Sequence, residues 1–162
     1  MRSVLLSRVV EIVSSGAVVL GLVFVGLELR HANRLAESES VNSLNGMIVE
    51  LNMSKYAAPA SKNLWADYYS GGLEAGTGLA PSDREILVNN FFSWMTLYEA
   101  AWKYHDTGIL GDEEFVGYIE GACDELSLGE FNREVWAESK RLFTPGYVDQ
   151  VETTCAALFR GE

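Results

Sequence analysis

The sequence has few of the residues on which common active sites depend. Its 162 residues include only two histidines and two cysteines. A di-iron helical bundle needs a pair of Glu-x-x-His motifs, and no such pair occurs. A G-x-S-x-G nucleophile elbow is missing as well. We therefore predict that the protein is not an enzyme and that it has no catalytic residue, no metal site and no cofactor.

Strand signals are missing as well. No segment alternates apolar and polar side chains as half-buried strands do, and the three prolines are widely spaced. The predicted fold class is all-α, with an N-terminal transmembrane helix that continues into a small helical bundle. Residues 1–30 form the predicted membrane anchor, residues 31–60 a stalk and the first bundle helix, and residues 61–162 an acidic helical domain.

Basic side chains are scarce beyond the N-terminal segment. Residues 1–36 carry four arginines and two glutamates, so that the net charge of -11 comes entirely from residues 37–162. The phosphates of a nucleic acid would be repelled by so acidic a domain, and we expect no nucleic-acid partner. A basic protein partner is compatible with this field, although most acidic surfaces only keep a domain soluble.

One long run without charge lies near the N-terminus. It extends from Ile12 to Leu27, 16 residues, which cover about 24 Å as a helix at about 1.5 Å per residue. Extending it to residues 9–29 approaches the ~30 Å thickness of a bilayer core. Glu11 and Glu28 would then lie near the two interfaces, where carboxylates reach water. We predict a single-pass membrane protein whose first partner is the lipid bilayer.

Two other interpretations of this run stay open: a cleaved signal peptide and the core helix of a soluble protein. The basic start and apolar centre fit a signal peptide, but no A-x-A-like cleavage site follows the run. Three glycines and two serines within the run would weaken a helix in water, yet they are common in membrane spans. Both points favour a retained anchor.

Small residues share one side of this helix with a carboxylate. At about 100° per residue, that side holds Ser14, Ala17, Gly21 and Glu28. Small residues at such spacing let another helix approach closely, so we predict packing against other transmembrane helices of a membrane protein complex. Small residues are frequent in any span, however, and Gly16 and Gly26 lie off this side.

The charges that flank the span are almost balanced. Arg2 and Arg8 precede it, and Arg30 and Arg34 follow it. The terminal amine adds to the first pair, so the positive-inside rule leans slightly toward a cytoplasmic N-terminus. That orientation would place the acidic domain outside the cytoplasm.

Helical periodicity continues beyond the span. Leu44, Met47, Ile48 and Leu51 have the spacing of a packed helix face, on a helix that is either continuous with the span or broken near His31. Further helices are predicted over Ser61–Tyr69, from Pro81 to Gly108 with a capping box of Ser82 and Glu85, from Gly111 to Gly129, over Phe131–Phe143, and over Tyr147–Phe159. The last two are expected to bury Leu142, Phe143, Leu158 and Phe159.

Two titratable side chains of the helix after Pro81 are candidates for chemistry. Glu99 is either a buried carboxylate with a raised pKa or, as we favour, the surface partner of Lys103 at i, i+4. His105 is interpreted as a hydrogen-bonded core residue. Gly71 and Gly76 have the separation of a phosphate-binding loop, but the expected lysine is missing and a solvated loop is favoured.

The two cysteines, Cys123 and Cys155, have no metal-ligand spacing. In an oxidising compartment they could form one disulfide. Because a free cysteine packs as a small hydrophobic side chain, two buried thiols are the favoured interpretation.

Several junctions of the chain resemble those of a known family. They are VGLELRHANR from Val25 to Arg34, SDRE at Ser82, KYHDTGIL from Lys103 to Leu110, REVW from Arg133 to Trp136, and LFTPGYV from Leu142 to Val148. In this order they resemble an uncharacterised bacterial family of small single-pass membrane proteins with a helical soluble domain. The resemblance covers nearly the whole chain. It implies a bacterial origin and this architecture, but no activity and no site residue.

The favoured function is a non-enzymatic, membrane-anchored interaction protein, an accessory or structural subunit of a larger membrane complex. The alternative is a membrane-tethered ligand-binding or sensory module with an aromatic pocket, whose candidate residues are Trp65, Tyr68, Trp94, Tyr98, Trp102 and Trp136. An enzyme of unfamiliar type would instead need groups such as Glu99 and His105 to converge in a cleft.

Overall fold

The structure is a computed structural model that describes residues 2–54, 64–66, 68–69 and 79–160, with side chains from residue 16 to residue 159 of these ranges. In chain order the elements are α1 (Arg2–Ser54), α3 (Pro81–Asp106), α4 (Asp112–Ser127), α5 (Glu130–Ser139), the 3-10 turn η1 (Lys140–Leu142), α6 (Pro145–Thr154) and α7 (Ala156–Arg160). No strand occurs among the described residues, and the chain is all-helical as predicted.

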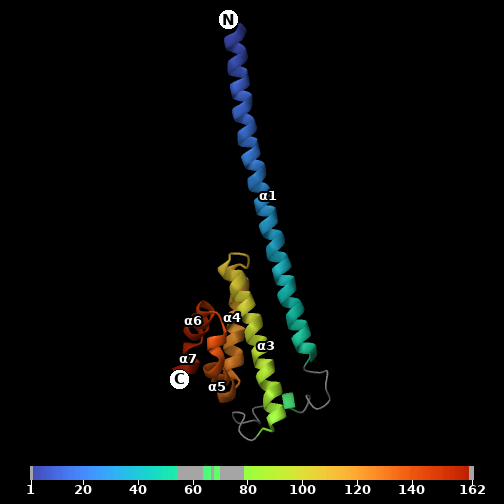
Figure 1. The fold of residues 1–162 in the computed structure, drawn as a ribbon, viewed down its shortest axis with the longest axis vertical. Helices are drawn as coiled ribbons and strands as arrows, with labels where there is room; N and C mark the ends of the chain where they lie inside the picture. The colour runs from blue at the N-terminus through green and yellow to red at the C-terminus, as the bar shows by residue number, and fades with distance from the viewer. Residues whose placement is uncertain (1, 55–63, 67, 70–78, 161–162) are drawn as a thin grey trace. The chain divides into compact units, whose positions relative to one another are not determined.

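The chain divides into two units, Met1–Glu39 and Ser40–Glu162. Helix α1 is continuous over 53 residues, and Figure 1 draws it as one unbroken coil. This confirms that the N-terminal helix continues into the first bundle helix, with no break near His31. The physical reason is local: neither glycine nor proline occurs between Leu27 and Asn45.

One hydrophobic core holds the second unit together. The last part of α1 contributes Leu44, which is fully buried. Helix α3 lies along α4 (Figure 1) and turns its apolar side toward it. The buried residues of α3 are Leu87, Phe91, Trp94, Met95, Leu97, Tyr98 and Ala101. Their helical spacing explains why this stretch forms the central helix, as its sequence pattern predicts.

Helix α3 has a proline start and a glycine end. Pro81 occupies the first turn and Ala80 the N-cap position, and no side chain caps the helix. The predicted capping box of Ser82 and Glu85 is therefore wrong, because Ser82 lies inside the first turn. Gly108 has a φ of 73°, and its N–H donates to the His105 carbonyl at 2.9 Å. Glycine adopts this left-handed conformation without a steric penalty.

The two C-terminal helices are shorter than predicted. The helix that begins at Glu130 ends at Ser139 and continues as η1, which turns Leu142 outward at 69% exposure while Phe143 stays buried. The prediction that Leu142 is buried is wrong because a 3-10 turn advances by about 120° per residue rather than 100°. The last helix is interrupted at Cys155, and Phe159 is 41% exposed rather than buried.

Parts of the predicted organisation lie outside the described residues. This applies to residues 55–60 of the predicted stalk and to Gly71 and Gly76 of the glycine-rich loop. Within the predicted helix Ser61–Tyr69, residues 64–66 and 68–69 are helical. Their side chains at Leu64, Trp65 and Tyr68 are buried in the core of the second unit.

Candidate functional site

Apolar side chains of α1 are exposed over a long stretch. From Val18 to Leu29 the large hydrophobic residues are between 53% and 71% exposed. Among the described residues, this is the one helix that is long and apolar enough to cross a membrane, and none of its apolar window is buried. The structure confirms that this run is helical and that its described side chains are exposed; its place in a membrane stays a prediction.

Three of the four predicted helix-packing residues have described side chains. Ala17, Gly21 and Glu28 are all exposed, whereas the side chain of Ser14 lies outside the described residues. A Cβ atom added at Gly21 would meet nothing within 4 Å, and the same holds for Gly16 and Gly26. No described side chain therefore blocks the approach of another helix at Gly21. Packing of another helix against this side stays a prediction.

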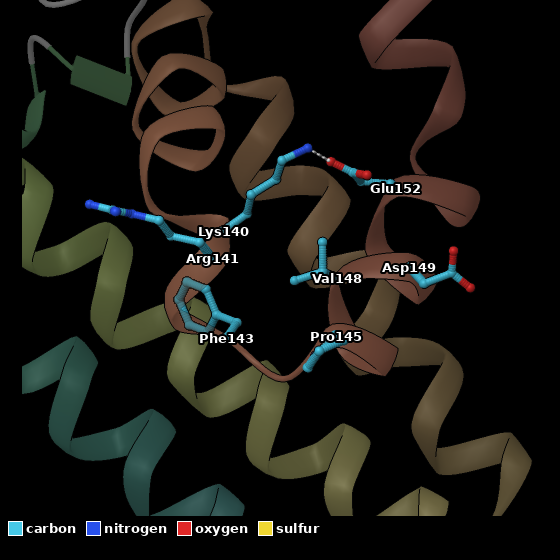
Figure 2. A pocket seen from close by; sticks show the side chains of 7 residues that line it. All are labelled: Lys140, Arg141, Phe143, Pro145, Val148, Asp149 and Glu152. Carbon is cyan, nitrogen blue, oxygen red and sulfur yellow. Dashed lines mark hydrogen bonds and ion pairs between the residues drawn. The ribbon is translucent and has the colours of Figure 1, made fainter.

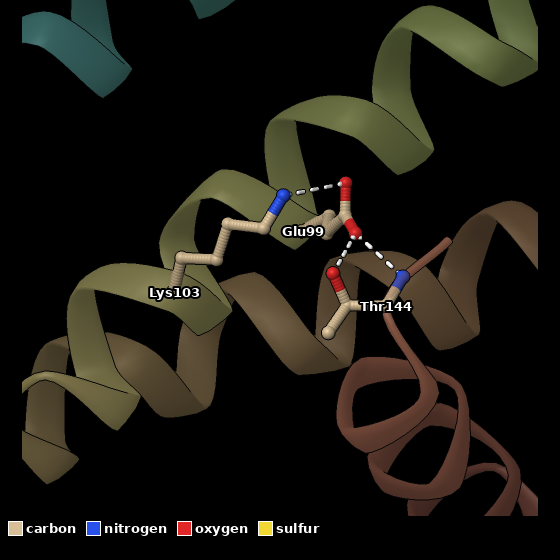
Figure 3. A network of polar contacts seen from close by, with 3 residues as sticks. All are labelled: Glu99, Lys103 and Thr144. Atoms are coloured by element: carbon tan, nitrogen blue, oxygen red, sulfur yellow. Dashed lines mark hydrogen bonds and ion pairs between the residues drawn. The ribbon is translucent and has the colours of Figure 1, made fainter. Parts of the chain in front are cut away.

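Glu99 is the centre of a polar network that joins α3 to the start of α6 (Figure 3). One carboxylate oxygen, Oε2, lies 3.2 Å from Lys103 Nζ, so the favoured i, i+4 pair is present. The other, Oε1, accepts hydrogen bonds from the backbone N–H of Thr144 at 2.7 Å and from its hydroxyl at 2.6 Å. The predicted surface location of the pair is wrong for Glu99, whose side chain packs against the start of α6. Thr144 is the N-cap residue of α6, so the carboxylate fixes the start of that helix.

These contacts decide the charge state of Glu99, whose side chain is only 13% exposed. Burial by itself would raise the pKa of Glu99. The hydrogen bonds from Thr144 and the ion pair with Lys103 outweigh burial and hold the pKa below its usual value. A raised pKa, the alternative considered from the sequence, is therefore wrong, and Glu99 acts as an ionised structural anchor.

His105 lies at the C-terminal end of α3 rather than in the core. Its ring stacks on Phe115 with the ring centres 4.2 Å apart, and its Nε2 lies 2.8 Å from Asp112 Oδ1. The predicted hydrogen bond is present, but the side chain is 31% exposed, so the core assignment is wrong. Glu99 and His105 have separate partners, and the structure does not bring them together.

A buried amide forms a second polar centre that the sequence did not reveal. Asn132 is fully buried in α5. Its Nδ2 donates to the carbonyl of Glu125 at 2.5 Å, and its Oδ1 accepts a hydrogen bond from the Tyr68 hydroxyl. Asn132 shares a helix side with Val135, and this spacing was the available signal.

Tyr147 has a fully buried ring at the start of α6. Within the described part of the chain its hydroxyl has no hydrogen-bond partner. Burial raises the pKa of this hydroxyl, with smaller contributions from Tyr98 and Glu99. Tyr147 is therefore a neutral packing residue, and its ring contacts Phe143 and Trp136.

The predicted aromatic pocket is largely filled core. Five of its six candidate aromatics are buried, and Trp102 is half-buried. A different hollow of about 430 Å³ lies between η1 and α6 (Figure 2), lined by Lys140, Arg141, Phe143, Pro145, Val148, Asp149 and Glu152. Lys140 is paired with Glu152 across it, while Arg141 and Asp149 point outward on opposite sides (Figure 2).

The two cysteines are joined. Cys123 of α4 forms a disulfide with Cys155, between α6 and α7, and their Cα atoms are 5.3 Å apart. The interpretation as two buried thiols is therefore wrong; the sequence alone could not show that residues 32 positions apart meet. Closing a loop of this size stabilises a fold by about 3–4 kcal/mol in the chain-entropy model.

In the part of the chain that the structure describes, no three His, Cys, Asp or Glu side chains group as metal ligands do. Comparison of the chain with protein-family models, curated proteins and solved structures found no match. The resemblance to a bacterial membrane-protein family thus stays an expectation from the sequence.

Proposed function

We propose that this protein is a non-enzymatic, membrane-anchored interaction protein, an accessory or structural subunit of a larger membrane complex. The observation that carries the proposal is the exposed apolar run of α1 from Val18 to Leu29. Soluble monomers rarely expose so large a continuous apolar surface, because each Å² costs about 25 cal/mol in water. A bilayer removes this cost and also satisfies the length of the helix.

A neighbouring helix is the proposed interaction partner. Lipid and a protein helix are equally apolar, so close packing rather than the hydrophobic effect has to drive association. The side with Ala17 and Gly21 carries small side chains that permit a close backbone approach, and a Cβ added at Gly21 would meet nothing within 4 Å. Glu28, on the same side near the interface, can accept a hydrogen bond from the partner.

Co-purification of the full chain from native membranes in mild detergent tests this proposal. We expect the wild-type protein to elute with one or more membrane proteins. Gly21→Leu should lose most of that association, whereas Gly26→Leu, off the predicted side, should keep it. A Cβ atom added at either position meets nothing within 4 Å. A wild-type monomer without partners, or equal losses in both variants, would contradict the proposal.

The hollow between η1 and α6 supports a second candidate function, a membrane-tethered ligand-binding module. Its volume of about 430 Å³ lies within the range of small-molecule sites, and apolar side chains from Phe143 and Val148 are combined with charged ones. Native mass spectrometry of the purified chain tests it. A bound small molecule should be lost in Val148→Trp, which fills the hollow, and kept in Val116→Trp on α4; finding none in the wild type contradicts this function.

A further inference from the structure

The disulfide carries information about the compartment of the second unit. The chain has two cysteines, and both are used in this one bond. Thiol buffers keep cysteine pairs reduced in the cytosol, whereas disulfides persist in secreted proteins and on the outer side of membranes. A cytosolic domain would hold the same two residues as buried thiols.

We infer that Ser40–Glu162 lies on the oxidising, non-cytoplasmic side of the membrane, where a disulfide-bearing thiol oxidoreductase supplies the Cys123–Cys155 bond. The assignment to one side of a membrane rests on the proposed membrane anchoring, whereas the assignment to an oxidising compartment does not. The bond itself depends only on the compartment in which the domain folds.

The exchange balances without any further reagent. The thiolate of one cysteine attacks a sulfur of the oxidoreductase disulfide, which forms a mixed disulfide and releases one thiolate of the oxidoreductase. The thiolate of the second cysteine then attacks the sulfur of the first. The Cys123–Cys155 bond forms as the mixed disulfide breaks. Two protons and two electrons have left the cysteine pair, and the oxidoreductase departs as a dithiol.

Charge supports the same side by an independent route. Arg2 and Arg8 precede the span together with the terminal amine, and Arg30 and Arg34 follow it, so the positive-inside rule leans slightly toward a cytoplasmic N-terminus. The cytoplasmic leaflet is rich in anionic lipids, and its surface potential repels an acidic domain. Both effects favour the outer side for residues 37–162, which hold the negative charge of the chain.

The first test counts free thiols in the full chain inside the cells that produce it. Cells are quenched with acid to stop thiol exchange, and the denatured protein is treated with a polyethylene glycol maleimide that adds a resolvable mass per thiol. We expect no addition before reduction and two additions after it. The double variant Cys123→Ser/Cys155→Ser gives the background. Any addition to the unreduced wild-type chain overturns the inference.

The second test determines the side directly. Every lysine of the chain follows the span, and one of them, Lys103, has a side chain that is 54% exposed. A membrane-impermeant amine reagent applied to intact spheroplasts should therefore label lysine peptides of this protein, while a cytoplasmic marker protein stays unlabelled. Labelling that requires permeabilised membranes overturns the inference.

Failure of the inference and failure of the proposed function give different results. A disulfide-bonded chain in the soluble fraction contradicts membrane anchoring but agrees with the inferred oxidising compartment. A membrane-bound chain with two free thiols contradicts the inference and leaves membrane anchoring standing.

Discussion

The two units of the chain use the same apolar residue types in opposite ways. In the first unit, the leucines and valines between Val18 and Leu29 are more than half exposed. In the second, residues such as Leu44, Leu126 and Val151 are fully buried. The second unit makes its own apolar environment, and the first has none within the described chain.

With α1 anchored in a membrane as proposed, the two units need different solvents. A helical bundle in water gains stability by burying its apolar side chains. The apolar stretch of α1 gains that stability only when lipid or another protein surrounds it. Charge follows the same division, because the acidic side chains that keep a domain soluble are concentrated in residues 37–162.

The largest expected effect comes from adding charge to the exposed apolar run. Leu20→Arg/Val23→Arg places two charges in the centre of the proposed span, at a cost of about 5–7 kcal/mol in a bilayer. We expect the protein to move from the membrane pellet to the soluble fraction or to fail to accumulate. The matched control, Val116→Arg/Leu142→Arg, changes two exposed residues of the second unit and should leave the protein in the pellet. Similar behaviour of both variants would remove the distinction between the units.

The next largest effect is expected at the buried amide of the second unit. Asn132→Ala removes the hydrogen bonds of Asn132 to the Tyr68 hydroxyl and to the Glu125 carbonyl and opens a cavity. We expect the free energy of unfolding to fall by about 2–4 kcal/mol. Denaturant titration of the detergent-solubilised chain measures it, with the exposed Asn89→Ala as control. A change below 1 kcal/mol would mean that the hydrogen bonds of Asn132 contribute little.

Close helix packing predicts that alanine substitutions at two glycines of α4 change the free energy of unfolding in opposite directions. A Cβ at Gly121 would lie 2.9 Å from the ring and hydroxyl of Tyr98, whereas a Cβ at Gly117 meets nothing within 4 Å. Gly121→Ala should therefore destabilise the second unit by about 1–3 kcal/mol. Gly117→Ala should stabilise it by about 0.5–1 kcal/mol through helix propensity. Thermal unfolding followed by circular dichroism separates them, and equal shifts would contradict the packing of α3 on α4.

Glu99 makes the stability of the second unit depend on pH. Its folded-state pKa is lowered from 4.5, so its contribution is complete above that pH and is lost as the pH falls through the lower folded value. Above pH 4.5, Glu99→Gln should be less stable than the wild type by about 1–2 kcal/mol. The difference should shrink in more acidic solution. Exposed Glu138→Gln is the control, and a difference that is constant with pH would contradict an ionised anchor.

The smallest expected effect concerns the hydroxyl of Tyr147, for which the described residues offer no hydrogen-bond partner. Removing a buried hydroxyl without a partner costs nothing, so Tyr147→Phe should leave the free energy of unfolding unchanged or raise it by up to about 1 kcal/mol. Tyr68→Phe is the matched comparison, because it loses a hydrogen bond to Asn132 and should destabilise by about 1 kcal/mol. If Tyr147→Phe is the more harmful change, the Tyr147 hydroxyl has a role that its contacts do not explain.

Local signals predicted much of the fold. Periodicity found α3 and α4, and Pro81, Gly108 and Gly111 marked their limits because glycine and proline restrict the backbone in known ways. The interruptions at Ser139 and Cys155 were missed, since neither has a glycine or proline beside it to mark it.

Long-range contacts were beyond the sequence. The carboxylate of Glu99 meets Thr144 from 45 positions away, and Cys123 meets Cys155 across 32. Periodicity describes one helix at a time and cannot say which helix ends meet. The apolar run of α1 was identified from composition alone. Composition does not reveal whether lipid or another protein surrounds that run.

Flotation of alkali-washed membranes on a density gradient tests the membrane anchoring of α1 most directly. Alkali strips peripheral proteins, and only chains held in the bilayer rise with the lipid. We predict that the full-length protein floats with the membranes. A chain that stays at the bottom of the gradient, or mature protein that begins after Arg30, would contradict the account.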